Sequence, residues 1–194
     1  MGNNKLYPIF LKASKLDILI IGGGKVALEK LTFLLKSSPD AKVSLRAKWF
    51  LPEVVRLADN FGIDIKEEAY HSPQLKGRQL IIAATNDLAV NKRIVSDAQQ
   101  ENILINVADM PDLCDFYLGG IVTKGDVKIA ISTNGKSPTL AKRLRQLLEE
   151  VLPNDIGLLA DNLNRYRMQL KADLDIRVSK LNDLTEGLLS KKES

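Results

Sequence analysis

Three short stretches of this chain carry residues that could bind an anion or move a proton. Three glycines at 22–24 follow a run of apolar residues and precede a helical pattern. Asp109 ends another apolar run, and Lys136 begins the basic stretch "KSPTLAKRLR" at 136–145. A glycine turn between a strand and a helix can bind a phosphate, a carboxylate can act as a general base, and clustered cations attract anions.

The glycines fit the dinucleotide-binding pattern G-x-G-x-x-A. Gly22 would allow the tight turn out of the strand, Gly24 would let the backbone approach a pyrophosphate, and Ala27 would let the helix pack closely on the sheet. The strand before the glycines and the helix after them are both predicted, which is the context that this motif requires. We therefore favour a dinucleotide site that includes Gly23 over a plain tight turn.

The second predicted strand ends without the acidic residue that usually holds the ribose hydroxyls of NAD. Arg46 stands there instead, with Lys48 close by. An arginine at this position favours the 2′-phosphate of NADP, and the alternative is a surface arginine with no cofactor role. The residues alone leave the choice between NAD and NADP open.

Asp109 and the basic stretch each have a structural alternative. Asp109 could act as a general base at the end of its strand, or it could cap the turn before Pro111. The stretch 136–145 has four cations and no anion, which suits an anion site or a solvated helix face. Ser137 is a fair N-cap for a helix that starts at Pro138.

Strands and helices alternate along the first part of the chain. Apolar runs predict strands at 17–21, 42–45, 63–68, 79–85 and 103–109. Helical spacing predicts the helices between them at 25–37, from Pro52, and from Leu88 after a cap at Asp87. This alternation predicts an α/β fold with a Rossmann-like, doubly wound parallel sheet, whose ligands bind at the carboxyl ends of the strands.

The rhythm changes after Pro111. Residues 119–135 predict two strands around a turn at 124–126, and a helix follows. From 154 to 190 apolar residues recur every three or four positions, which predicts an amphipathic helix and a second one after it. We expect a Rossmann domain, a small α+β segment and a C-terminal helical domain, at 1–112, 113–150 and 151–194.

Composition excludes several classes of protein. The chain has 194 residues, of which 45% are hydrophobic and 27% charged, so it can bury a real core. A net charge of +4 is too small to indicate a nucleic-acid partner, and no apolar run approaches a membrane span. The single cysteine, Cys114, fits the reducing cytoplasm, and with His71 as the single histidine we expect no resident metal site.

Five stretches in order and spacing carry a resemblance to a known family, namely "LYPIF", "IIGGGKVALEK", "IIAATNDLAVN", "INVADMPDLCDF" and "IAISTNGKSPTLAKRLR". Together they resemble the precorrin-2 dehydrogenase family of sirohaem synthesis, closely over residues 5–150 and loosely beyond. The family includes stand-alone dehydrogenases, dehydrogenase–ferrochelatases and the N-terminal half of sirohaem synthase. The resemblance implies oxidation of the tetrapyrrole precorrin-2 to sirohydrochlorin with NAD, in a homodimer formed through the segment after the Rossmann domain. For bifunctional members it implies Fe²⁺ as a further substrate.

The resemblance also implies roles for individual residues. The main catalytic aspartate of the family's N-x-x-D-x-P stretch falls on Asp109. Cofactor contacts fall after the glycines, past the second strand and after the fourth, on Lys25, Val26, Lys48, Trp49, Thr85 and Asn86. A substrate fringed with carboxylates needs cations and helix N-termini, which the turn after 133 and the helix behind it would supply with Asn134, Gly135, Lys136, Ser137 and Arg143.

The chain departs from the family pattern in places, including the stretch Leu28-Glu29-Lys30, where members often have a charged residue and then Arg. Gly119 and Gly120 stand where many members have a proline with a small residue, which bears on substrate geometry. Thr133 stands where some members carry a phosphorylated serine, so no modification is carried over. The alternatives to the dehydrogenase are a non-catalytic NAD(P)-binding regulatory module, a structural dimerisation protein, and an NADP-linked dehydrogenase of another substrate.

Overall fold

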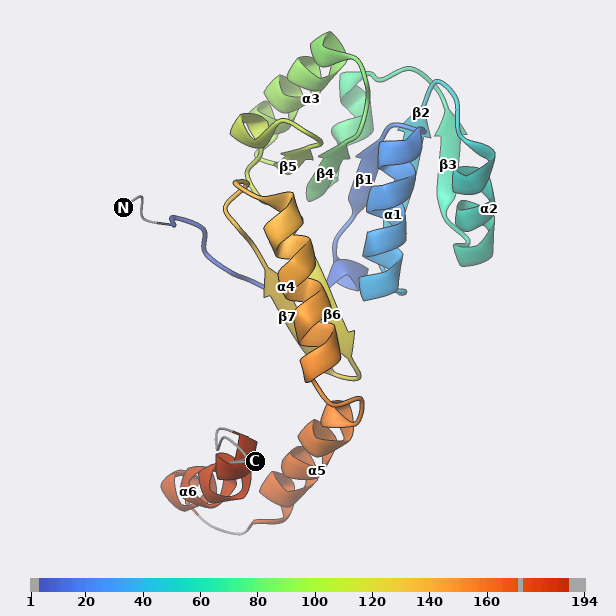
Figure 1. The fold of residues 1–194 in the computed structure, drawn as a ribbon. Helices are drawn as coiled ribbons and strands as arrows, with labels where there is room; N and C mark the ends of the chain where they lie inside the picture. Colours follow the sequence, from blue (N-terminus) through green and yellow to red (C-terminus); the bar gives the residue numbers. More distant parts are fainter. Residues whose placement is uncertain (1–3, 171–172, 189–194) are drawn as a thin grey trace. The chain divides into compact units, whose positions relative to one another are not determined.

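A computed structural model describes residues 4–170 and 173–188, and Figure 1 traces the chain. The chain divides into two compact units. The first unit holds residues 1–119 with 132–141, and the second holds 120–131 with 142–194. The three-domain division expected from the sequence, with boundaries at 112 and 150, stays a prediction about which segments fold on their own.

A five-stranded parallel sheet forms the centre of the first unit. Its order is β3-β2-β1-β4-β5, and all four strand pairs are parallel. The strands are β1 (Ile18–Ile21), β2 (Val43–Ala47), β3 (Asp64–Glu67), β4 (Leu80–Ala83) and β5 (Leu104–Val107). The direction of winding reverses between β1 and β4, which confirms the Rossmann-like, doubly wound sheet.

Local sequence signals set the ends of the helices in this unit, which are α1 (Lys25–Ser37), α2 (Pro52–Phe61) and α3 (Leu88–Gln100). Pro52 begins α2, and Gly62 ends it in the left-handed conformation. The Asp87 side chain caps α3 by accepting from the N–H groups of Ala89 and Val90. Short 3₁₀ turns lie at Ala13–Lys15, Ser72–Leu75 and Pro111–Leu113.

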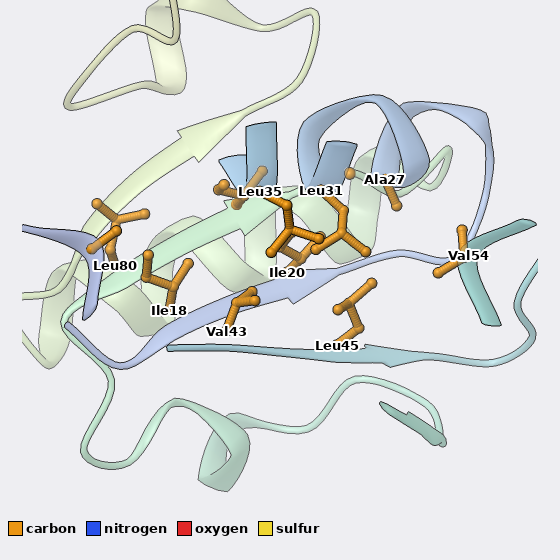
Figure 2. Packing of buried hydrophobic residues seen from close by; sticks show 12 residues of the cluster. Ile18, Ile20, Ala27, Leu31, Leu35, Val43, Leu45, Val54 and Leu80 are labelled. Atoms are coloured by element: carbon orange, nitrogen blue, oxygen red, sulfur yellow. The ribbon is translucent and has the colours of Figure 1, made fainter. Parts of the chain in front are cut away.

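The sheet is covered on both faces, so the central strands β1 and β4 are continuously apolar and buried, whereas the edge strand β3 is largely polar and exposed. On one face Ala27, Leu31 and Leu35 of α1 point at Ile20 and its neighbours in the sheet, as Figure 2 shows. Val54 of α2 joins the same cluster. On the other face the sheet packs against α3 and the Ser72–Leu75 turn, through Leu19, Ile21, Leu75, Ile81, Ile94 and Ile105.

The second unit contains an antiparallel hairpin of β6 (Gly120–Lys124) and β7 (Val127–Ile131). Helix α4 (Pro138–Val151) begins in the first unit and belongs to the second from Lys142 onward. Helices α5 (Ile156–Gln169) and α6 (Leu174–Thr185) follow, and a 3₁₀ turn lies at Glu186–Leu188. The hairpin turn meets the start of α5 backbone to backbone, because a Cβ on Gly125 would lie 3.0 Å from the Cα of Gly157. The two helices that the sequence predicted after residue 154 are present as α5 and α6.

Candidate active site

The glycine turn lies between the carboxyl ends of β2 and β4. The N–H of Gly22 donates to the carbonyl of Arg46 at 2.9 Å, and the carbonyl of Gly23 accepts from Leu51 at 2.9 Å. On the other side the N–H of Ala84 donates to Ile21 at 2.8 Å. The turn is therefore held at the switch point of the sheet, where doubly wound folds bind their ligands.

The three glycines are required for different reasons. Gly22 has a φ of +138°, and a Cβ there would lie 2.3 Å from the carbonyl oxygen of Ala84. A Cβ on Gly23 would lie 2.0 Å from the carbonyl oxygen of Trp49. A Cβ on Gly24 would meet nothing closer than the Trp49 ring, at 3.7 Å. The chain's own packing thus explains Gly22 and Gly23, whereas Gly24 borders open space that a Cβ would fill.

The N-terminus of α1 faces the same space without a cap from the chain. Its N-cap is Gly24, which has no side chain to accept a hydrogen bond, and its first turn holds no acidic residue. The first amide groups of a helix carry partial positive charge and bind anions when they are left free. Lys25 is exposed beside them, whereas Val26 packs partly into the core. This arrangement fits the diphosphate of a dinucleotide.

Two predicted cofactor residues lie just beyond β2. Lys48 is exposed, and the indole of Trp49 is 55% exposed although it lies over Gly24. An exposed aromatic ring beside a phosphate-binding turn offers a flat apolar surface for a base or a nicotinamide. Arg46, in contrast, is enclosed by acceptors, since its guanidinium pairs with Asp64 and Glu68.

Thr85 and Asn86 follow β4, but they differ in hydrogen bonding and in exposure to solvent. The Thr85 hydroxyl lies 2.6 Å from Oδ1 of the buried Asn91, and Asn91 Nδ2 donates back to the Thr85 carbonyl at 3.0 Å. These bonds fix the turn into α3. Asn86 is exposed at the edge of the sheet. Thr85 therefore stabilises the turn into α3, whereas the Asn86 side chain is accessible to a ligand.

Asp109 lies two residues beyond the end of β5, in a turn rather than on the strand that was predicted to reach it. Its φ is +60°, a left-handed conformation that is uncommon for residues other than glycine and costs free energy. Among the described residues its carboxylate has no hydrogen-bond or ion-pair partner, and the side chain is exposed. The capping role that the sequence left open for Asp109 is therefore not present.

Cys114 holds this turn through its thiol, and the sequence predicted no role in the site for this residue. Its Sγ accepts from the N–H of Val107 at 3.1 Å and lies 3.2 Å and 3.3 Å from the carbonyl oxygens of Val107 and Met110. Burial raises the pKa of the Cys114 thiol, so the proton needed for donation is retained at neutral pH. Asp115 adds a bond from the Ile105 N–H at 3.0 Å. Cys114 follows its partner Val107 by seven residues, and no known sequence motif predicts a contact at this spacing.

The predicted substrate turn lies beside the Asp109 turn in the first unit. Asn134 and Gly135 have φ values of +56° and +74°, and a Cβ on Gly135 would lie 3.9 Å from the Cβ of Pro111. The Ser137 hydroxyl accepts from the Leu140 N–H at 3.1 Å and so caps α4. The fold therefore gathers the exposed Lys136 and the N-terminus of α4 near the 109–111 turn.

Arg143 belongs to the second unit, where its Nη1 donates to Gln146 at 3.1 Å. It is exposed there, as is the neighbouring Lys142.

In the described part of the chain no group of three or more His, Cys, Asp or Glu side chains gathers where a metal ion could bind. None of the described helices is long and apolar enough to cross a bilayer.

Fold and site together define a Rossmann-type dinucleotide-binding protein. A family model described as "Putative NAD(P)-binding" matches residues 9–120, and one described as "Sirohaem biosynthesis protein central" matches 124–150. Because the first of these models matches more than half of the chain, the chain belongs to this NAD(P)-binding family.

Similar proteins extend the comparison. Siroheme synthases from Methylococcus capsulatus and Vesicomyosocius okutanii are 41% and 39% identical over 88% and 85% of this chain. The chain spans about a third of their length, 34% and 35%. A solved structure described as SirC, precorrin-2 dehydrogenase, matches with a TM-score of 0.74 at 21% identity, covering 92% of this chain and 89% of that one. The resemblance to the sirohaem family is thus confirmed, and the structural match supports the fold.

Proposed function

We propose that this protein is an NAD-dependent dehydrogenase that oxidises precorrin-2 to sirohydrochlorin. The observation that carries the proposal is the pairing of an open glycine turn at Gly24 with an unpartnered, left-handed Asp109 in one unit. The siroheme synthase relatives and the solved precorrin-2 dehydrogenase support the substrate class.

The cofactor would be held by the first unit. The amide groups at the start of α1 would bind the diphosphate, with Lys25 beside them and Gly24 leaving room for it. Trp49 and Asn86, both exposed, line the approach. When bound, the nicotinamide would accept a hydride from the substrate.

Asp109 would take the proton that the macrocycle loses along with the hydride. The overall balance is precorrin-2 and NAD⁺ to sirohydrochlorin, NADH and a proton. An exposed carboxylate without internal partners is available to a substrate and need not break a bond to accept the proton. The strained turn holds it in place, since Cys114 ties that turn to β5.

The substrate is fringed with acetate and propionate groups, which need positive charge. Lys136 and the N-terminus of α4 offer it next to the 109–111 turn, together with the backbone of Asn134 and Gly135. These contacts would orient the ring. Arg143, which the sequence also predicted to bind substrate, belongs to the second unit, and its role stays a prediction.

The second unit is proposed to form a homodimer. Leu144, Leu147 and Val151 make an exposed apolar stripe on the part of α4 that lies in this unit, with spacings of three and four residues. Such a stripe is stable in water only when something covers it. A second copy of the chain is the occupant that the resemblance implies. A cytoplasmic location remains a prediction from the cysteine content.

An anaerobic assay tests the proposal. Purified protein is mixed with precorrin-2 and NAD⁺, and the absorbance of NADH and of sirohydrochlorin is followed. We expect both products to appear together at a one-to-one ratio. Binding of NAD⁺ without turnover would favour the regulatory module, and no binding of either nucleotide would favour a structural protein. Addition of Fe²⁺ as substrate then tests the ferrochelatase activity that bifunctional members have.

A further inference from the structure

The guanidinium of Arg46 is enclosed by acceptors from the chain itself. Nη2 lies 2.5 Å from Oδ2 of Asp64, and Nε lies 3.2 Å from Oε1 of Glu68. Nη1 donates to the carbonyl oxygen of Leu45 at 2.8 Å. Only 14% of the Arg46 side chain is exposed. Each nitrogen of this arginine therefore already has a partner.

Arg46 occupies the place in the fold where the adenosine ribose is recognised. It precedes the last residue of β2, and its carbonyl accepts from Gly22 in the phosphate-binding turn. In dinucleotide-binding folds an acidic side chain at this place holds the ribose hydroxyls of NAD, and an arginine nearby accommodates the 2′-phosphate of NADP. The state of Arg46 thus bears directly on which cofactor fits.

Glu68, the residue after the end of β3, brings the missing acidic group to this place. Its N–H donates to the carbonyl of Ala47 at 2.7 Å, which sets it beside the end of β2. Its second oxygen pairs with Lys66 at 2.9 Å, and this contact lowers the pKa of the Glu68 carboxyl below its ordinary value. The side chain is 19% exposed, so a fixed negative charge stands beside Arg46.

We infer that Arg46 and Glu68 form a latch that makes the protein select NAD over NADP. To bind a 2′-phosphate, Arg46 would have to leave two carboxylates, and the phosphate dianion would approach those same carboxylates. Both effects act against NADP, whereas the 2′-hydroxyl of NAD carries no charge. The inference rests on the proposed function, because it assumes that the chain binds a dinucleotide.

The test compares the dissociation constants of NAD⁺ and NADP⁺ by calorimetry, for the full chain and two variants. Glu68→Gln removes the charge that holds Nε of Arg46. Glu67→Gln is the matched control, since it removes one charge from the adjacent, exposed residue of β3, for which no ion pair is found among the described residues. We expect the unaltered chain to prefer NAD⁺, Glu68→Gln to reduce that preference about tenfold, and Glu67→Gln to leave it within about twofold.

Equal affinity of the unaltered chain for both nucleotides would overturn the inference, as would the same preference in both variants. Should Glu68→Gln fail to give a cooperative thermal transition, Asp64→Asn replaces it, because the Asp64 side chain is 67% exposed and its loss spares the core. That variant is expected to reduce the preference about threefold, and an unchanged preference would again overturn the latch. Failure to bind either nucleotide would instead overturn the proposed function.

Discussion

The parallel sheet of the first unit is covered by helices on both faces, whereas in the second unit neither α5 nor the part of α4 from Lys142 onward has a fully buried residue. Among the described hydrophobic residues outside the first unit, the buried ones are Val122 and Ile131 of the hairpin. The first unit thus has a core of its own. The second unit presents apolar faces that a partner would have to cover.

The two units differ in what their packing suits them for, namely chemistry in the first unit and association in the second. A rigid, doubly covered sheet can hold strained residues such as Asp109, because the surrounding packing determines their conformation. An exposed helix with an apolar stripe can pack against another protein surface, which displaces water from the stripe without a rearrangement of the helix itself. We therefore expect substitutions in the first unit to affect chemistry or folding, and those in the second unit to affect association.

The largest effect is expected for Asp109→Asn in the first unit. Loss of the proposed general base should reduce kcat by a factor of about 10² to 10⁴, while the dissociation constant of NAD⁺ stays nearly unchanged. Stopped-flow absorbance with precorrin-2 and a separate calorimetric titration measure the two quantities. The matched control is Asp112→Asn, an exposed acidic residue of the next turn, which should keep full activity. Unaltered kcat in Asp109→Asn would remove Asp109 from the reaction.

The glycine turn should separate folding from binding. Gly22→Ala places a Cβ 2.3 Å from a backbone oxygen and should lower the free energy of unfolding by about 3 kcal/mol. Gly24→Val adds its side chain to open space, so the protein should unfold normally in urea but bind NAD⁺ at least about tenfold more weakly. Equal stability of the two variants, or normal NAD⁺ binding by Gly24→Val, would contradict this division of roles.

The second unit should respond to a charge on its apolar stripe. Leu147→Glu should weaken the proposed homodimer by about ten- to a hundredfold, because burial of a leucine contributes about 1.5–3 kcal/mol. Analytical ultracentrifugation over a range of concentrations measures the change. Phe33→Glu on α1 is the control, since Phe33 and Leu147 are 56% and 54% exposed, and it should leave the association state unaltered. Loss of the dimer in both variants, or in neither, would be inconsistent with an interface on α4.

The smallest effect concerns the Cys114 thiol, which supports the Asp109 turn. Because burial raises the pKa of Cys114, little thiolate forms at pH 8, and alkylation by iodoacetamide should be about tenfold slower in the native protein than in 8 M urea. The rate is followed by mass spectrometry. Equally fast alkylation in both states would mean that the thiol is free in solution and does not hold the Asp109 turn.

The sequence predicted the first unit well and parts of the site less well. The switch point, the cap at Asp87 and the start of α2 at Pro52 follow from local rules and are confirmed. The strand expected to reach Asp109 ends earlier, because the 114–116 segment bonds to β5 and the chain turns at 108. The roles assigned to single residues, Asp109 and Lys136 among them, stay predictions.

The sequence by itself determined the parallel sheet, the glycine turn and the change of pattern after Pro111. These follow from apolar periodicity and from residues that permit few backbone conformations, and both are properties of neighbouring positions. Only the tertiary structure decided that Arg46 is enclosed by Asp64 and Glu68 and that the Gly135 turn lies beside Pro111. Those contacts join residues about 20 positions apart. They depend on how β2 pairs with β3 and on where the turns come together, and the local sequence pattern contains neither.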